Sequence, residues 1–275
     1  MAIPILTTWK NYFNNYDEGL GSSYERVVLN NFLKKIIKHF RIDSILEAPS
    51  FGFTGLSGIN TLEPAINGIE VSLLDHDNER IELIRKVWLE AGKICNIKYV
   101  ENYSHLPFMS HVFDLSWNFS AIWFVKDLEN FINELNRVTK KVIIFCIPNV
   151  SGIGYLSQEY FGRQEIADFL QVENLSPDYF GDQLEKLGWQ LLDSNYIDCP
   201  PWPDIGMPKE KFLDKFGISI RKEKESDPLT IMDMYTGVNP EFDVEMMKYY
   251  WFEHYAPGFV KKFWAHHKYF IFVKK

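Results

Sequence analysis

Two apolar segments of strand length, each ending in an acidic residue, constrain the fold of this chain most strongly. The first runs from Ser44 to Glu47 and opens into a loop that contains Gly52 and Gly55; the second ends at Asp75. In a parallel α/β sheet the loop after the first strand lies against a nucleotide ligand, and an acid ending the second strand can accept hydrogen bonds from ribose hydroxyls. Asp75 follows Gly55 by about 20 residues, the spacing typical of such sites. The sequence therefore predicts the start of a nucleotide-binding α/β domain.

Short motifs follow in a fixed order between Glu101 and Pro148. They are a polar–aromatic pair, a Leu-Pro-Phe turn, a Phe-Asp strand start, an Arg-Val helix end and an apolar run: Asn102 with Tyr103, Leu106 to Phe108, Phe113 with Asp114, Arg137 with Val138, and Val142 to Ile147. In this order they resemble the class I methyltransferases that use S-adenosylmethionine (SAM). The resemblance covers roughly residues 22–196, most of the chain.

The resemblance implies that SAM is the cofactor and that residues at the sheet edge contact it. In the family the glycine loop passes along the ligand, the acid after strand two faces the ribose, and residues after strand three hold the adenine. The residues expected to bind the cofactor here are Glu47, Gly52, Gly55, Asp75, His76, Asn102, Tyr103 and Asn118. Other roles stay open: Asp75 can cap the next helix, Glu47 can order the glycine loop, and Asn118 can satisfy loop backbone.

The expected fold class is α/β, a doubly wound, mostly parallel, seven-stranded Rossmann-like sheet with an antiparallel final strand and an inserted subdomain. Residues 1–198 and 268–275 form the methyltransferase core with an N-terminal helical cap, and residues 199–267 form the insert. Apolar runs at 189–196 and 268–273 predict the last two strands.

Helix boundaries are expected from capping residues and apolar periodicity. Ser22 and Glu25 match a capping box, which predicts a helix over 22–40. Asp77 is expected to cap a helix that ends at Gly92. Further helices are expected around the apolar positions from Leu128 to Leu135, and between Ser176-Pro177 and Gly188.

The segment from Cys199 to His267 is too long for a hairpin turn and is rich in proline and aromatic residues. Its CPPWPD start cannot continue a strand, because consecutive prolines lack ladder donors. We expect the segment to form an acceptor-binding or lid subdomain, although its aromatic residues also suit simple packing. The candidate acceptor contacts are Tyr16, Tyr24, Trp202 and His254.

The amino-acid composition limits which binding partners and which cellular compartment are expected. The formal net charge of −8 argues against nucleic acid as a partner and favours a small-molecule acceptor. Three widely spaced cysteines without a CxxC motif, and no apolar run of ~18 residues, favour a cytoplasmic protein without a transmembrane segment. The histidines form neither HExxH nor a compact Cys/His set, so no metal site is expected. A homodimer is left open.

The function expected from these observations is methyl transfer from SAM to a small molecule. The acceptor's nucleophilic atom attacks the sulfonium methyl group, and alignment of the two carries most of the catalysis; the sequence singles out no catalytic base. Pro49 replaces the family's usual first glycine and Asn102 a more frequent Asp. These departures favour one alternative, a catalytically inactive SAM-binding regulatory or interaction protein. A nicotinamide-dependent oxidoreductase is disfavoured because the GxGxxG fingerprint is absent.

Overall fold

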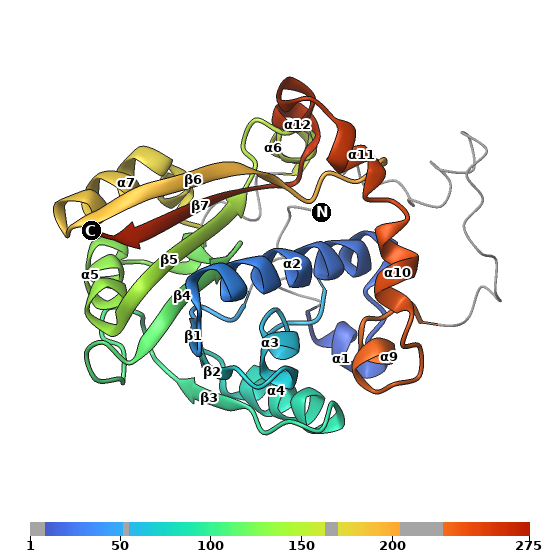
Figure 1. Cartoon of the computed structure of the whole chain (residues 1–275), viewed down its shortest axis with the longest axis horizontal. Coiled ribbons are helices and arrows are strands. Elements are labelled where there is room, and N and C mark those ends of the chain that lie inside the picture. The colour runs from blue at the N-terminus through green and yellow to red at the C-terminus, as the bar shows by residue number, and fades with distance from the viewer. Residues whose placement is uncertain (1–8, 52–54, 163–169, 204–227) are drawn as a thin grey trace.

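A seven-stranded sheet in the order β3-β2-β1-β4-β5-β7-β6 organises the protein (Figure 1). The structure, a computed structural model, describes residues 9–51, 55–162, 170–203 and 228–275. The strands are β1 (Ser44–Glu47), β2 (Glu70–Asp75), β3 (Asn96–Tyr99), β4 (Phe113–Phe119), β5 (Thr139–Pro148), β6 (Trp189–Ile197) and β7 (His267–Lys274). β7 lies antiparallel between β5 and β6, and the other pairs are parallel. The predicted fold class is confirmed.

Helices cover both faces of the sheet, as expected for a doubly wound fold. They are α1 (Tyr12–Asn15), α2 (Gly19–Phe40), α3 (Leu62–Ile66), α4 (Asn78–Glu90), α5 (Leu128–Val138), α6 (Ile153–Gly162), α7 (Pro177–Lys186), α9 (Met232–Tyr235), α10 (Phe242–Met247), α11 (Trp251–Tyr255) and α12 (Gly258–Trp264). Short 3-10 helices are η1 (Trp9–Asn11), η2 (Ile122–Phe124) and η4 (Val172–Leu175).

Successive side chains of the central strands point to opposite faces of the sheet and contribute to two hydrophobic cores. In β1, Ile45 packs with α2 and α4 on one face, and the next residue, Leu46, packs with α5 and α7 on the other. Every residue of β1 and β4 is buried, the polar ones included, because both faces of these central strands are covered. Helices thus cover both faces of the sheet, so a ligand can reach only the edges of the sheet and the ends of its strands.

Helix α2 begins three residues earlier than the capping box predicts. Ser22 and Glu25 lie inside the helix, so the predicted start is wrong. Gly19 has φ +66°, and its N–H is accepted by Asp17 Oδ1 at 3.0 Å. This local contact starts the helix before Ser22 and leaves the Glu25 side chain buried in the interior.

The other predicted helix ends agree with the structure. Asp77 caps α4 by accepting from the N–H groups of Glu79 and Arg80, and Gly92 follows with φ +71°. α7 starts at Pro177, and Gly188 follows its end with φ +85°. These signals were readable because each acts within a few residues of its own position.

The described part of the insert packs against α2. Trp202 together with Ile231, Met232, Phe242 and Met246 belongs to the same hydrophobic core as the buried face of α2. Figure 1 shows α9 and α10 beside the N-terminal half of α2, and α11 and α12 near α6. The division into residues 1–198 with 268–275 and an insert at 199–267 stays a prediction.

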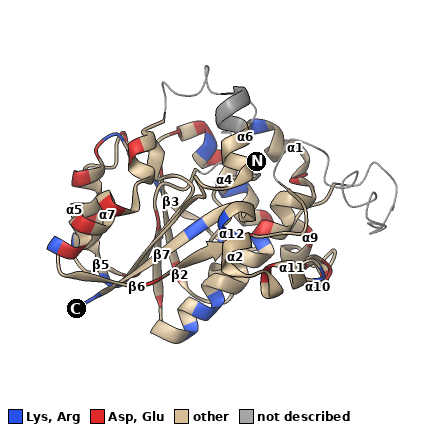
Figure 2. Cartoon of the chain, turned by 90° about the horizontal axis from the view of Figure 1, so that it is seen from above, with Lys and Arg blue, Asp and Glu red and all other residues tan. Residues whose placement is uncertain are grey.

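Charges of both signs are distributed over the described elements. Figure 2 shows acidic residues along α5 and α7 and basic residues along α2. None of the helices that the structure describes combines the length and apolarity needed to cross a bilayer.

Candidate active site

The carboxyl ends of β1, β2 and β4 bring together three of the polar residues predicted to bind the cofactor. Glu47 and Asp75 are the last residues of β1 and β2, and Asn118 is the penultimate residue of β4. Because these neighbouring strands run parallel, their ends share one edge of the sheet. All three side chains are buried, Glu47 and Asp75 completely.

Asp75 is held by a full set of donors. Its Oδ1 accepts from the Asp77 N–H at 2.9 Å and from Arg80 Nη2 at 2.5 Å. Its Oδ2 accepts from Ser50 Oγ at 2.8 Å and from Arg80 Nε at 2.9 Å. An ionised carboxylate accepts about four hydrogen bonds, so this set uses its capacity. A ribose hydroxyl could bond to Asp75 only if one of these donors moved.

Arg80 is itself enclosed at this edge. Its guanidinium carbon lies 3.9 Å from the ring centroid of Phe51 and 5.1 Å from that of Trp9. The side chain is 3% exposed, so the ion pair with Asp75 is shielded from water. The planar guanidinium both pairs bidentately and stacks on aromatic faces, which suits arginine and not lysine.

Glu47 orders the segment that follows the glycine loop. Its two carboxylate oxygens accept from Asn60 Nδ2 at 2.7 Å and from Thr61 Oγ1 at 2.5 Å. Burial raises the pKa of the Glu47 carboxyl to about 7, although these two hydrogen bonds oppose the shift. Of the two roles open to Glu47 from the sequence, the contacts in the structure support loop ordering.

A residue that the sequence did not single out, Glu18, holds the glycine loop from the other side. Glu18 Oε1 accepts from the Leu56 N–H at 2.7 Å and from Arg26 Nη2 at 3.1 Å. A Cβ at Gly55 would lie 2.0 Å from Glu18 Oε1, and Gly55 has φ +67°, so both the contact and the backbone require glycine. Glu18 Oε2 is buried without a hydrogen-bond partner among the described residues.

His76 and Tyr103 form a pair beside the end of β2. His76 Nδ1 and Tyr103 Oη are 3.0 Å apart. Burial lowers the pKa of His76, so its imidazole is neutral at pH 7. Asn102 lies exposed beside this pair, and its Oδ1 accepts from the Ser104 N–H at 3.1 Å. Asn102 thus supports its own loop, whereas Tyr103 is buried as a wall.

The end of β4 carries two buried polar atoms with unused bonding capacity. Asn118 Nδ2 donates to the Ala48 carbonyl at 2.9 Å, but Asn118 Oδ1 has no partner within the part of the chain that the structure describes. The same holds for Ser120 Oγ. Ser120 also has φ +47°, a conformation that a serine adopts only where its surroundings impose it. Because buried polar atoms are rarely unpaired, both atoms mark a candidate ligand contact.

The four candidate acceptor contacts divide into two groups. Tyr24 and Trp202 meet edge to face with ring centroids 5.5 Å apart, and Tyr24 Oη donates to Glu253 Oε2 at 3.3 Å. Tyr16 instead donates to Glu90 Oε1 at 2.8 Å, and His254 is exposed on α11. The structure therefore joins Tyr24 to Trp202 and places Tyr16 and His254 elsewhere. Gly52 lies outside the described residues.

The polar atoms at this edge fit one end of SAM better than the other. Asn118 Oδ1 and Glu18 Oε2 are unused acceptors, which suit a ligand's ammonium group. Asp75, which was expected to face the ribose, is instead occupied by Arg80. Ser120 and Glu18 were missed because a strained serine has no sequence signature, and Glu18 contacts residues about 40 positions away.

Comparisons with known proteins agree with the fold. A family model described as a methyltransferase domain matches residues 54–147. A SAM-dependent methyltransferase from Thermotoga maritima is similar in structure, with a TM-score of 0.53 at 12% identity over 97% of this chain and 95% of that one. A SAM-dependent methyltransferase from Aquifex aeolicus gives a TM-score of 0.42 at 14% identity over 60% of this chain and 83% of that one.

No curated protein matches the sequence. The domain match spans the glycine loop's end through β5, the region that carries Asp75, Tyr103 and Asn118. The strand order and the antiparallel β7 extend the agreement to the C-terminal strands. Residues 54–147 therefore carry a methyltransferase domain, and the sheet has the Rossmann-like fold of SAM-dependent methyltransferases, in which SAM is the methyl donor.

Proposed function

We propose that the protein transfers the methyl group of SAM to a small-molecule acceptor bound at the carboxyl edge of the sheet, next to the end of β4. The observation that carries this proposal is the pair of buried, unused polar atoms on Asn118 and Ser120. A polar ligand that bonded to them would recover the free energy that each unpaired buried group costs, about 1–3 kcal/mol. In this arrangement Asn118 contacts SAM and Ser120 contacts the acceptor, so that the two ligands meet at the end of β4.

We propose the cofactor contacts from the buried polar atoms that have unused hydrogen-bonding capacity. Asn118 Oδ1 and Glu18 Oε2 accept from the ammonium group of SAM, and the His76–Tyr103 pair borders the adenine. Asp75 accepts from the ribose after Arg80 gives up part of its bidentate contact. When bound, SAM supplies an activated methyl group, so the protein's part is to align the acceptor and to exclude water.

The acceptor pocket that we propose uses the Tyr24–Trp202 pair as an apolar wall. Both rings are fully buried, and Trp202 also meets Tyr249 with centroids 5.1 Å apart. Such a wall suits a compact organic molecule. The acidic net charge of −8 supports the same acceptor class, because a polyanion would be repelled.

A second candidate is a protein that binds SAM or its product without catalysis. The observation that favours it is the saturated Asp75 carboxylate, since the usual ribose contact is absent while Arg80 stays in place. The two candidates differ in turnover and not in fold.

The test uses SAM labelled in its methyl group, incubated with the full chain and a cell extract divided into small molecules, RNA and protein. We expect label in the small-molecule fraction and stoichiometric release of S-adenosylhomocysteine. Label in RNA or protein would overturn the acceptor class. Binding of S-adenosylhomocysteine by calorimetry without transfer to any fraction would favour the second candidate.

The ribose assignment has a separate test. Asp75→Ala should weaken S-adenosylhomocysteine binding by about 1–3 kcal/mol if the carboxylate accepts from the ribose. Unchanged affinity in a folded Asp75→Ala variant would show that Asp75 serves only to anchor Arg80.

A further inference from the structure

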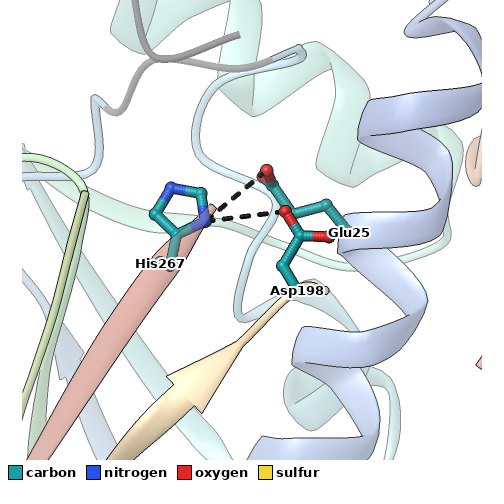
Figure 3. A group of neighbouring side chains, drawn as sticks. All are labelled: Glu25, Asp198 and His267. Atoms are coloured by element: carbon teal, nitrogen blue, oxygen red, sulfur yellow. Dashed lines mark ion pairs between the residues drawn. The ribbon is translucent and has the colours of Figure 1, made fainter. Parts of the chain in front are cut away.

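A second polar cluster lies where the insert leaves and rejoins the sheet (Figure 3). Glu25 comes from α2, Asp198 directly follows β6, and His267 is the first residue of β7. His267 Nδ1 lies 3.6 Å from Asp198 Oδ2 and 3.9 Å from Glu25 Oε2. One ligand atom from each residue falls within 4.8 Å of the other two. Three segments distant in sequence thus converge on one point.

The three side chains are buried, and the His267 ring lies within ion-pair distance of both carboxylates. Their exposed side-chain fractions are 3% for Glu25, 0% for Asp198 and 6% for His267. Separations of 3.6 and 3.9 Å exceed the length of a hydrogen bond. Asp198 Oδ1 and His267 Nδ1 have no hydrogen-bond partner among the described residues. In Figure 3 both carboxylates lie on the side of the His267 ring that carries Nδ1.

We propose that Glu25, Asp198 and His267 bind a divalent transition-metal ion. Zn²⁺ is the ion with which the proposal is tested first. In a tetrahedral site with ligand distances of about 2.1 Å, the donor atoms lie roughly 3.4 Å apart. The observed separations of 3.6 and 3.9 Å are slightly wider, so small side-chain rotations bring the three donors to bonding distance. An ion between them would also give the buried His267 Nδ1 a partner.

The donor set selects the class of ion. One imidazole nitrogen and two carboxylate oxygens suit Zn²⁺, Mn²⁺ or Fe²⁺, whereas Mg²⁺ prefers six oxygens. Three protein ligands leave at least one position for a water molecule. His266 Nδ1 lies 2.7 Å from Asp198 Oδ2 and so orients this carboxylate from outside the group, as partners of metal ligands commonly do.

Burial favours an ion over an organic ligand at this point. Glu25, Asp198 and His267 are all buried side chains, so the point between them leaves little room for an organic molecule. An ion needs little space and offsets the charge of two buried carboxylates, which is otherwise costly. The sequence shows no metal motif because the ligands come from three distant segments. The site does not depend on the proposed methyl transfer.

The test uses tag-free full-length protein, stripped with a chelator and titrated with Zn²⁺ and Co²⁺. We expect one Zn²⁺ per chain, visible Co²⁺ absorption from a site of low coordination number, and a rise in melting temperature at excess Zn²⁺ because the ion binds only the folded state. X-ray absorption of the zinc-loaded protein should show nitrogen and oxygen ligands with imidazole scattering. Absence of stoichiometric Zn²⁺, Co²⁺ and Mn²⁺ binding, or sulfur in the first shell, would overturn the proposal.

Variants assign the site to these residues. His267→Gln and Asp198→Asn should each lower Zn²⁺ affinity by roughly 100-fold or more, because each removes a direct ligand. His39→Gln changes an exposed histidine on α2 and should bind as the parent does. Parental affinity in folded His267→Gln would place the ion elsewhere and refute the proposal. If both variants fail to fold, Glu25→Gln and the absorption spectrum of the parent decide the matter.

Discussion

Two buried carboxylate sites at the same edge of the sheet differ in how their hydrogen bonds are met. Asp75, at the end of β2, receives donors from Ser50, the Asp77 backbone and Arg80. Asp198, beyond β6, has one oxygen without a partner among the described residues and faces His267 across a gap of 3.6 Å. A satisfied buried network stabilises the fold by itself, whereas an incomplete one is costly until a ligand completes it. The contrast assigns a structural role to Arg80 at Asp75 and a ligand-binding role to the Asp198 cluster.

Removing Arg80 from the hydrogen-bonded network of Asp75 should have the largest effect on stability. Arg80→Met keeps apolar contact with Phe51 and Trp9 but leaves Asp75 as an unpaired buried carboxylate. We expect a loss of about 3–5 kcal/mol in the free energy of unfolding, measured by urea denaturation.

The matched control for this variant is Arg85→Met on the same helix. Arg85 pairs with Glu82 at the surface, where both side chains are about half exposed or more. Its loss should cost less than about 1 kcal/mol. Equal losses in the two variants would contradict the view that the Asp75–Arg80 pair is a main anchor of this edge.

The next largest effect is expected at Glu47, whose carboxyl should make the free energy of unfolding depend on pH. Burial raises the pKa of its carboxyl from 4.5 to about 7, so the folded state holds a proton that the unfolded state loses. Stability therefore falls as pH rises from 4.5 to 7, by roughly 3 kcal/mol, and levels off above pH 7. Chemical denaturation across this range should show a shallower decline in Glu47→Gln.

The amide in Glu47→Gln can keep both neighbours of the carboxylate. Its oxygen accepts from Asn60 Nδ2, and its NH₂ group donates to the Thr61 hydroxyl, which can turn. Glu253, whose pKa burial also raises to about 7, contributes the same sign to parent and variant and cancels in their difference. Parallel pH curves for the two proteins would show that Glu47 stays ionised when buried.

Ser120 tests whether unused bonding capacity marks ligand binding. Ser120→Ala removes a hydroxyl that has no partner among the described residues, so the free energy of unfolding should change by less than about 1 kcal/mol. If the hydroxyl contacts cofactor or acceptor, kcat/KM should fall about 10-fold, the cost of one lost hydrogen bond. Parental kcat/KM would remove Ser120 from the proposed site.

Asn102 should give the smallest effect. In Asn102→Asp the carboxylate can still accept from the Ser104 N–H, and the side chain is exposed, so stability should stay within about 0.5 kcal/mol. S-adenosylhomocysteine should bind at least as tightly by calorimetry, since a carboxylate is the stronger acceptor for the adenine amino group. Weaker binding by more than tenfold would show that Asn102 acts as a donor to the ligand.

Most helix ends were predictable because their signals are local, whereas the seven-stranded sheet with its antiparallel final strand was expected from the family resemblance. Asp77 caps the helix that follows it, and Gly92 and Gly188 end helices through their own backbone conformation. The start of α2 was mispredicted because Ser22 and Glu25 match a capping box, while the contact that decides the start is the bond from Gly19 to Asp17. Two local signals competed, and only geometry distinguishes them.

The site was less predictable because its contacts join distant segments. Asp75 and Glu47 were found from their place at strand ends, but the sequence does not show that Arg80 saturates Asp75 or that Glu47 binds Asn60 and Thr61. The Glu25, Asp198 and His267 cluster is more remote still, since its members come from three segments far apart in the sequence. Only the packing of α2 against the ends of β6 and β7 brings them together.

The pairing of β6 with β7 has a consequence for how this protein can be altered. Ile197 and His267 are direct partners in the antiparallel register, so the chain leaves and re-enters the sheet at adjacent positions. In topological terms, the residues between them are the loop of a very long hairpin. Closing a loop costs little more as it lengthens, about 0.6 kcal/mol for each doubling. Loop closure therefore sets little limit on the length of this segment, and what constrains it instead is the packing of Trp202, Phe242 and Met246 against α2.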